Sequence, residues 1–214
     1  MNDWFALRLS AAALLVALPS AAQNWEFGGA AGFGFYRDVS LSGPGGSGRA
    51  GFGPRFALGA VVGRSLGEHF SVEGRCTFQD GDLEIKSGST KADLDGDASS
   101  FLGEFSFWPL PRRARIRPYV AAGVGTKLYR GTQDPAADEP LMDLAVMHHA
   151  TQAVGLVTYG GGVKVRLTPR WLLRLDFRDY TTPFPAHIMS PAPGVRAGGW
   201  IHDFVPMLGV SWGG

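Results

Sequence analysis

The clearest pattern in the sequence is an alternation of apolar and polar positions between residues 157 and 178. From Val157 to Leu167 the odd positions carry valine, tyrosine, glycine or leucine, while the even positions carry threonine, glycine, lysine or arginine. After a break at 168–170, leucine and phenylalanine alternate with arginine and aspartate up to Arg178. A period of two indicates β-strands, because successive side chains point to opposite faces of a sheet. These two runs therefore predict a β-hairpin with one apolar and one charged face.

The same alternation recurs along the rest of the chain. It predicts six further strands, at residues 24–38, 51–63, 70–78, 100–108, 116–130 and 200–212. With the hairpin this gives eight strands, and most supply roughly the 9–11 residues that a tilted strand needs to cross a bilayer. The sequence therefore predicts an all-β fold.

The connections between the predicted strands alternate strictly between long and short. The long ones are 39–50, 79–99, 131–153 and 181–199, and the short ones are 64–69, 109–115 and 168–170. An antiparallel up-and-down barrel with every second connection on one side of a membrane produces this alternation, whereas a Greek-key sandwich does not. Two pieces of the second long connection, 83–85 and 92–94, are expected to extend the flanking strands beyond the membrane surface.

Composition agrees with a barrel and excludes other classes. The chain has 214 residues, 31 of them glycine, and a net charge of +1. The balanced charge gives no reason to expect nucleic-acid binding. Cys76 is the single cysteine, so no intrachain disulfide is possible.

Residues 1–22 have the pattern of a cleavable secretory signal helix. Arg8 supplies the positive charge, 9–18 form a short apolar run, and Ala21 and Ala22 offer small residues for cleavage before Gln23. The run is short of the ~20 residues of a spanning helix. The expected organisation is a signal peptide at 1–22 and one barrel domain at 23–214.

Three pieces of the sequence resemble the OmpA-like eight-stranded outer-membrane β-barrel family. They are 117–125 (RPYVAAGVG), the glycine-rich hairpin at 160–178, and the closing amphipathic strand that reaches Trp212. The resemblance covers about 23–212. It implies a Gram-negative outer-membrane protein, inserted by the barrel assembly machinery as a monomer, in contact with outer-membrane lipids and lipopolysaccharide. With eight strands, both termini are expected on the periplasmic side.

In such a barrel the apolar faces meet lipid and the charged faces fill the lumen. An eight-stranded barrel is just wide enough for side chains, so a plugged lumen is expected, with a narrow channel as the alternative. Charges of both signs at similar depth predict an ion-pair network, since a buried charge without a partner costs several kcal/mol. The predicted network comprises Glu26, Arg55, Glu73, Arg75, Glu104, Arg117, Lys164, Arg174, Asp176 and Arg178.

Aromatic residues gather near the predicted strand ends, as in the two girdles that flank the apolar band of a membrane barrel. The predicted girdle residues are Trp25, Tyr36, Phe78, Trp108, Trp171, Trp200 and Trp212. Basic residues near the outer rim could pair with lipopolysaccharide phosphates; these are Arg37, Arg130 and Arg196.

No enzymatic, metal or cofactor site is predicted. The histidines show no His-x-Ser arrangement of the kind found in lipid A-modifying barrels, although His202 lies near the outer rim. The acidic run at Asp93, Asp95 and Asp97 fails the calcium-loop pattern. A structural, surface-interaction or lipopolysaccharide-contacting role is therefore expected. A lipid A-modifying enzyme and a soluble lipocalin-like binder, which would reverse the two faces, stay as alternatives.

Overall fold

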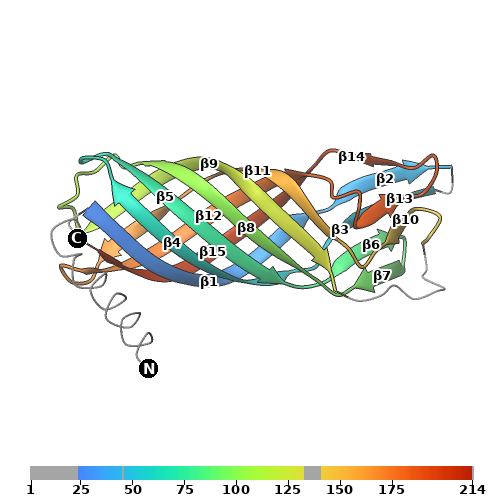
Figure 1. Cartoon of the computed structure of the whole chain (residues 1–214), viewed down its shortest axis with the longest axis horizontal. Coiled ribbons are helices and arrows are strands. Elements are labelled where there is room, and N and C mark those ends of the chain that lie inside the picture. Colours follow the sequence, from blue (N-terminus) through green and yellow to red (C-terminus); the bar gives the residue numbers. More distant parts are fainter. Residues whose placement is uncertain (1–23, 45, 133–140, 214) are drawn as a thin grey trace, which may run out of the picture.

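The computed structural model describes residues 24–44, 46–132 and 141–213, so the predicted signal peptide at 1–22 lies outside the described residues. Eight antiparallel strands close into a barrel in the order β1-β15-β12-β11-β9-β8-β5-β4 (Figure 1). Their bounds are β1 Trp25–Arg37, β4 Arg55–Ser65, β5 Phe70–Asp80, β8 Gly96–Phe107, β9 Ile116–Gly131, β11 Thr151–Arg166, β12 Trp171–Pro183 and β15 Trp200–Gly213. Within the described ranges, no helix has both the length and the hydropathy needed to cross a membrane.

The eight-stranded up-and-down fold predicted from the alternation is confirmed. Each barrel strand pairs with its neighbours along the chain, and β1 pairs with β15 to close the sheet, for example at Phe27 and Trp212. We call the end with the three short connections the turn end, and the end with the long connections the loop end. The described chain begins and finishes at the turn end (Figure 1).

The apolar face of the sheet points outward. Phe56, Phe105, Leu175 and Leu208 are 47%, 49%, 57% and 57% exposed, whereas Glu104 and Arg174 inside the barrel are 3% and 1% exposed. A wall of exposed phenylalanine, leucine and valine is stable in hydrocarbon but not in water. This orientation contradicts the lipocalin alternative, which needs an apolar interior.

The long connections are folded, and this corrects the expectation of an open loop at 39–50. They form a five-stranded sheet in the order β14-β2-β3-β6-β7 and a two-stranded sheet of β10 and β13. The bounds are β2 Val39–Gly43, β3 Gly46–Phe52, β6 Leu83–Ser87, β7 Thr90–Leu94, β10 Ala145–Met147, β13 Met189–Pro191 and β14 Arg196–Gly198. The pieces at 83–85 and 92–94 do form strands, but they pair with each other as a hairpin of the separate five-stranded sheet and do not extend the barrel strands β5 and β8, which corrects that expectation.

These extra strands enclose an apolar core that continues the barrel at its loop end. We call it the head core; it contains Leu41, Ile85, Met147, Ile188 and Met189, each at most 1% exposed. In the barrel the interior is charged and the exterior apolar, but here the interior is apolar. The reversal follows from the surroundings, because a segment in water buries its apolar face inward.

Candidate functional site

The lumen near the turn end is filled by a network of ion pairs. Arg174 donates to Glu26 at 3.0 Å and to Glu73 at 2.8 Å, and the Lys164 ammonium lies 2.7 Å and 2.9 Å from the same two carboxylates. Four strands contribute, so the network ties together parts of the chain that are far apart in sequence. Each carboxylate has at least two cationic partners, as burial in a low-dielectric lumen requires.

A second level of the network lies further along the lumen. Arg178 donates to both oxygens of Glu104, at 2.8 Å and 3.1 Å. Arg75 lies 3.2 Å from Asp176 and 3.4 Å from Glu104, and the Tyr119 hydroxyl also donates to Asp176. Glycines on β11 leave room for these groups, since a Cβ at Gly162 would come within 2.9 Å of the Tyr119 ring.

The structure thus brings together eight of the ten residues predicted for the network. The other two, Arg55 and Arg117, lie elsewhere, which corrects the prediction. Arg55 is fully buried, 4.7 Å above the Phe52 ring, and its three guanidinium nitrogens have no hydrogen-bond partner among the described residues. Arg117 lies at the turn-end mouth, over the Trp108 ring. Both were predicted to join the network because they are charged and have inward parity. They lie at other depths along the barrel axis, and this separates them from the network.

A smaller polar group lies between the network and the head core, and the sequence analysis missed it. The Lys127 ammonium donates to Asp203 at 2.6 Å and to the Tyr36 hydroxyl at 2.8 Å. Nearby, Tyr129 and Thr182 share a hydrogen bond of 2.9 Å. Lys127 on β9 and Asp203 on β15 both occupy inward positions of the alternation. This alternation is the sequence feature from which their place in the lumen could have been predicted.

Two of the predicted girdle aromatics point inward, so their assignment to the girdles is wrong. Tyr36 bonds to Gln79 and Lys127 in the lumen. Trp108 is 2% exposed and donates its indole N–H to Ser71 at 2.9 Å. Both have the parity of the charged face, which decides direction whatever the distance from a strand end. The remaining five lie on the outward side, namely Trp25, Phe78, Trp171, Trp200 and Trp212.

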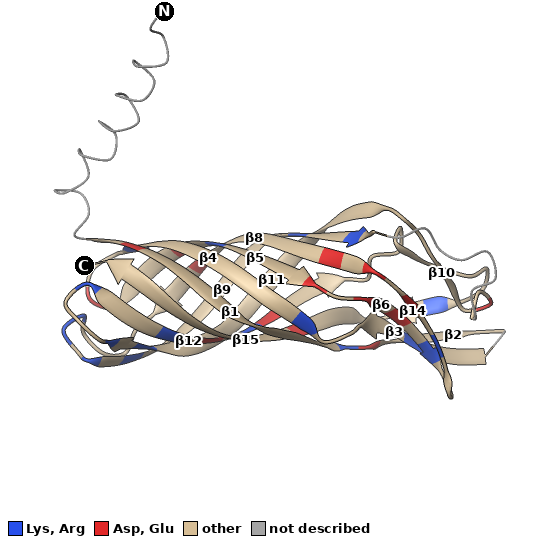
Figure 2. Ribbon diagram, turned by 90° about the horizontal axis from the view of Figure 1, so that it is seen from below, with Lys and Arg blue, Asp and Glu red and all other residues tan. Residues whose placement is uncertain are grey.

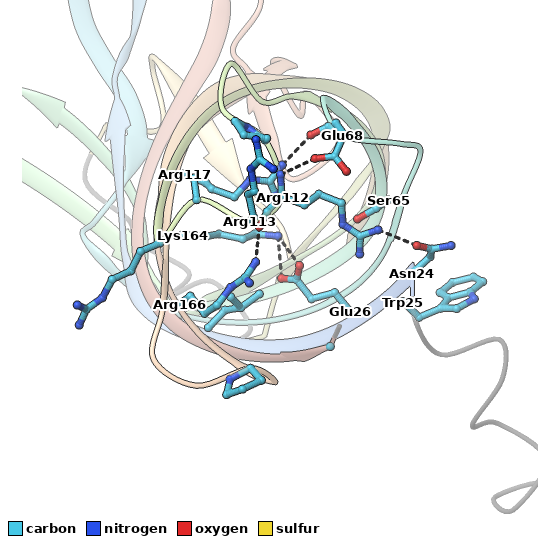
Figure 3. Close-up of a pocket in the computed structure, with 16 residues that line it drawn as sticks. Asn24, Trp25, Glu26, Ser65, Glu68, Arg112, Arg113, Arg117, Lys164 and Arg166 are labelled. Carbon is cyan, nitrogen blue, oxygen red and sulfur yellow. Dashed lines mark hydrogen bonds and ion pairs between the residues drawn. The ribbon is translucent and has the colours of Figure 1, made fainter.

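A pocket of about 750 Å³ opens at the turn-end mouth of the barrel (Figure 3). Six cationic side chains line it, Arg112, Arg113, Arg115, Arg117, Arg166 and Lys164, against two carboxylates, Glu26 and Glu68. Figure 2 shows basic segments gathered in the turns at this end of the ribbon. The inner wall includes Lys164 and Glu26, so the lumen network closes the pocket from within.

A polar cluster interrupts the apolar outer wall near the loop end. Asp179 is only 3% exposed although it has outward parity on β12, because side chains of two neighbouring strands cover it. Tyr159 donates its hydroxyl to Asp179 at 2.6 Å, and the His202 Nδ1 lies 2.8 Å from the same oxygen. Thr181 lies 3.3 Å from Asp179 and from His202 Nδ1. We call these four residues the wall cluster.

The wall cluster differs from a catalytic triad. In a triad the histidine uses one ring nitrogen for the nucleophile and the other for the acid. Here the Thr181 hydroxyl and the Asp179 carboxylate both contact Nδ1 of His202. The arrangement orients the imidazole with Nε2 away from the acid, which suits hydrogen bonding to a ligand rather than activation of Thr181. The sequence signal for Asp179 was an acidic residue at an apolar-parity position.

Comparison with known proteins agrees with this architecture. The structure is similar to Neisserial surface protein A (TM-score 0.55, 14% identity, 89% of this chain and 96% of that chain). It is also similar to the N-terminal β-barrel domain of Pseudomonas aeruginosa OprF (TM-score 0.47, 14% identity, 89% and 97%) and to the outer membrane protease OmpT of Escherichia coli (TM-score 0.49, 11% identity, 90% and 97%). At 14% identity, the likeness to Neisserial surface protein A shows the fold alone. A search of curated protein sequences finds no match.

The sequence itself matches one family over most of its length. The match is to the "Outer membrane protein beta-barrel domain" family and extends over residues 9–191. The closed eight-stranded sheet, the apolar outer wall and the charged lumen are the features expected of such a barrel. The chain belongs to the outer membrane protein beta-barrel domain family.

Proposed function

We propose that the protein is a structural outer-membrane barrel with a plugged lumen, whose loop-end rim contacts the headgroups of lipopolysaccharide. The turn end, with both termini, then faces the periplasm, and the loop end faces the outside. The lumen supports a plug, since the ion network fills the barrel and the head core adds a second closure. Monomeric insertion by the barrel assembly machinery is part of the same proposal.

One observation carries the lipopolysaccharide contact, namely a row of polar outward side chains at the upper edge of the apolar wall. Arg37 on β1, His202 on β15 and Thr181 on β12 are cross-strand neighbours in register. Directly below them Phe177 and Phe204 stack at 6.2 Å. An apolar surface that ends in an arginine and an oriented histidine matches the junction between acyl chains and phosphorylated sugar headgroups.

The depth of this row fits the outer interface. Along β15, Trp212 at the turn-end girdle is ten positions after His202. At roughly 3.3 Å per residue and a tilt of about 40°, this is roughly 25 Å of depth, about the height of the apolar band of a membrane barrel. Arg37 is exposed and forms no salt bridge with any described residue. Arg130, by contrast, pairs with Asp97 at 3.2 Å, and Arg196 lies beyond the rim on β14.

Thermal unfolding of the refolded protein in bilayers with and without lipopolysaccharide tests this proposal. Lipopolysaccharide should raise the unfolding temperature of the wild-type protein, because it binds only the folded barrel. Arg37→Gln should lose about half or more of that increment, since one charge-assisted phosphate contact is removed. Arg196→Gln is the matched control and should keep the full increment. If wild type gains nothing from lipopolysaccharide, or both variants respond as wild type does, the headgroup contact at Arg37 is excluded.

A further inference from the structure

We propose that the basic pocket at the turn-end mouth binds a phosphate-bearing anion. Anion binding by this pocket does not involve the loop-end rim. That the pocket faces the periplasm rests on the orientation given in the proposed function. The pocket is concave, about 750 Å³ in volume, and large enough for an anion with one or two phosphate groups and a small organic body. Three features of its lining support this ligand class.

The first feature is an excess of positive charge. Six cationic side chains and two carboxylates line the pocket, a formal surplus of four positive charges. Lys164 and Glu26 are already paired with each other and with the lumen network. The remaining lining therefore has five arginines against Glu68 alone. Charges this close repel one another, and a bound polyanion removes that repulsion.

The second feature is that neutral oxygen atoms help to hold three of the arginines in place. Arg117 donates to the backbone carbonyls of Glu68 at 3.0 Å and Leu110 at 3.4 Å. Arg112 donates to the Asn24 side-chain amide oxygen at 2.7 Å, and Arg166 donates to the Arg112 carbonyl. Carbonyls orient a guanidinium group without neutralising it. These arginines are therefore positioned in advance, as an anion site requires.

The third feature is a pair of arginines at the mouth that have no visible structural role. Within the described part of the chain, the side chains of Arg113 and Arg115 form neither a hydrogen bond nor a salt bridge. Both belong to the turn between β8 and β9 and line the pocket together with the positioned arginines. A phosphate entering the pocket would meet fixed guanidinium groups at the wall and adjustable ones at the rim.

Guanidinium groups favour phosphate because their planar fork gives two parallel hydrogen bonds to its oxygens. Apolar side chains at the edge of the pocket, Trp25, Leu172 and Pro169, leave space for the organic part of a ligand. The same phosphate chemistry has two sources at a periplasmic mouth, which are a free pyrophosphate or phosphate ester and the headgroup of an anionic phospholipid.

Calorimetric titration of the full refolded chain in uncharged detergent micelles tests the site. The probes are inorganic pyrophosphate and a short-chain phosphatidylglycerol, with citrate as a carboxylate comparison. Wild type should bind at least one phosphate probe more tightly than citrate, and binding should weaken with added salt. The double variant Arg113→Gln/Arg115→Gln should weaken binding at least tenfold, since the loss of a single charged hydrogen bond already accounts for about a factor of ten. It should fold normally, because neither side chain has a structural contact.

Arg117→Gln should weaken binding to a similar degree, and Arg196→Gln at the loop end should leave it unchanged. Binding of pyrophosphate supports a free phosphate ligand, and pocket-dependent binding of phosphatidylglycerol alone supports a lipid headgroup. The proposal is overturned if neither probe binds, if citrate binds equally well, or if Arg196→Gln weakens binding as much as the pocket variants. The lipopolysaccharide contact is tested at Arg37, at the opposite end of the barrel from the pocket. The two proposals can therefore fail separately, and the failure of one does not prevent the test of the other.

Discussion

Arg55 and Arg174 show that burial alone does not make a charged residue stabilising. Both are at most 1% exposed inside the barrel. Arg174 donates to two carboxylates, Glu26 and Glu73, whereas the Arg55 guanidinium lies over aromatic rings and has no hydrogen-bond partner among the described residues. A buried cation loses its hydration, and only the partnered one recovers that free energy through ion pairs.

This contrast predicts opposite effects for the same substitution. Arg174→Met should lower the free energy of unfolding by about 3–5 kcal/mol, because it leaves buried carboxylates undercompensated. Arg55→Met should change it by no more than about 1 kcal/mol or should stabilise the protein, because lost cation–π contacts are offset by the avoided desolvation. Urea unfolding of the refolded protein in lipid vesicles measures both. An Arg55→Met loss as large as that of Arg174→Met would mean that Arg55 has a partner of its own.

At the residue scale, direction could be predicted from parity but partnership could not. The alternation assigned the eight network residues to the lumen correctly. Tyr36 and Trp108 also occupy inward positions of the alternation, so their direction followed from parity and not from their nearness to a strand end. The partners of Arg117 are backbone carbonyls of a turn, which no pattern of side chains reveals. Asp179 was missed because its polar neighbours come from two other strands.

At the scale of elements, the β6–β7 hairpin depends on a charge group outside the membrane. The Glu84 carboxylate bonds to Lys86 and lies 3.0 Å from the Lys91 ammonium. Burial acts to raise the pKa of Glu84, but hydrogen bonds from Lys86 and Lys91 outweigh it and hold the pKa below its usual value of 4.5. A carboxylate with a lowered pKa stabilises the folded state above the unfolded pKa, and this contribution is lost as the pH falls through the folded value.

Protection of the hairpin amides against hydrogen exchange should therefore depend on pH through Glu84. At pH 6.5, amides of β6 and β7 should be better protected in wild type than in Glu84→Gln, by less than about fivefold because both lysines are largely exposed. As the pH falls through the lowered pKa of folded Glu84, the difference should shrink until the two proteins are equally protected. Nuclear magnetic resonance of the protein in micelles, corrected for intrinsic exchange, measures this. A difference that persists unchanged at low pH would assign the effect to the shape of the side chain.

The barrel strands were predictable as elements, whereas at the loop end only the short strands at 83–85 and 92–94 were. Each barrel strand carries its own alternation over 11 or more residues, so local sequence is sufficient. The segment 39–50 is rich in glycine and serine. Its few apolar residues, such as Leu41, are identified as core residues only by the folded structure, in which they pack with Ile85, Met147 and Ile188. Each distant segment contributes only a few residues to this core, so no segment carries an alternation long enough to predict the core from sequence.

At the scale of the whole molecule, the interior changes character along the barrel axis. It is ionic near the turn end, carries the Lys127–Asp203 pair further along, and is apolar in the head core. The apolar wall outside ends where the head core begins, since the surroundings change from lipid to water at that level. Two kinds of packing therefore occupy the interior, ionic near the turn end and apolar at the loop end, and both are consistent with the closed barrel proposed above.

This packing predicts a barrel that does not conduct ions, even when the ion network is weakened. Wild type in planar bilayers should show no unitary current steps, because eight strands leave a lumen that side chains fill. The paired substitution Glu104→Ala/Arg178→Ala, which preserves net charge, should also stay closed, because the head core still blocks the loop end. An open porin measured in the same bilayers shows that current steps are detectable. Reproducible steps from the wild-type protein would favour the narrow-channel alternative, and steps from the variant alone would show that the ion network is the only effective seal.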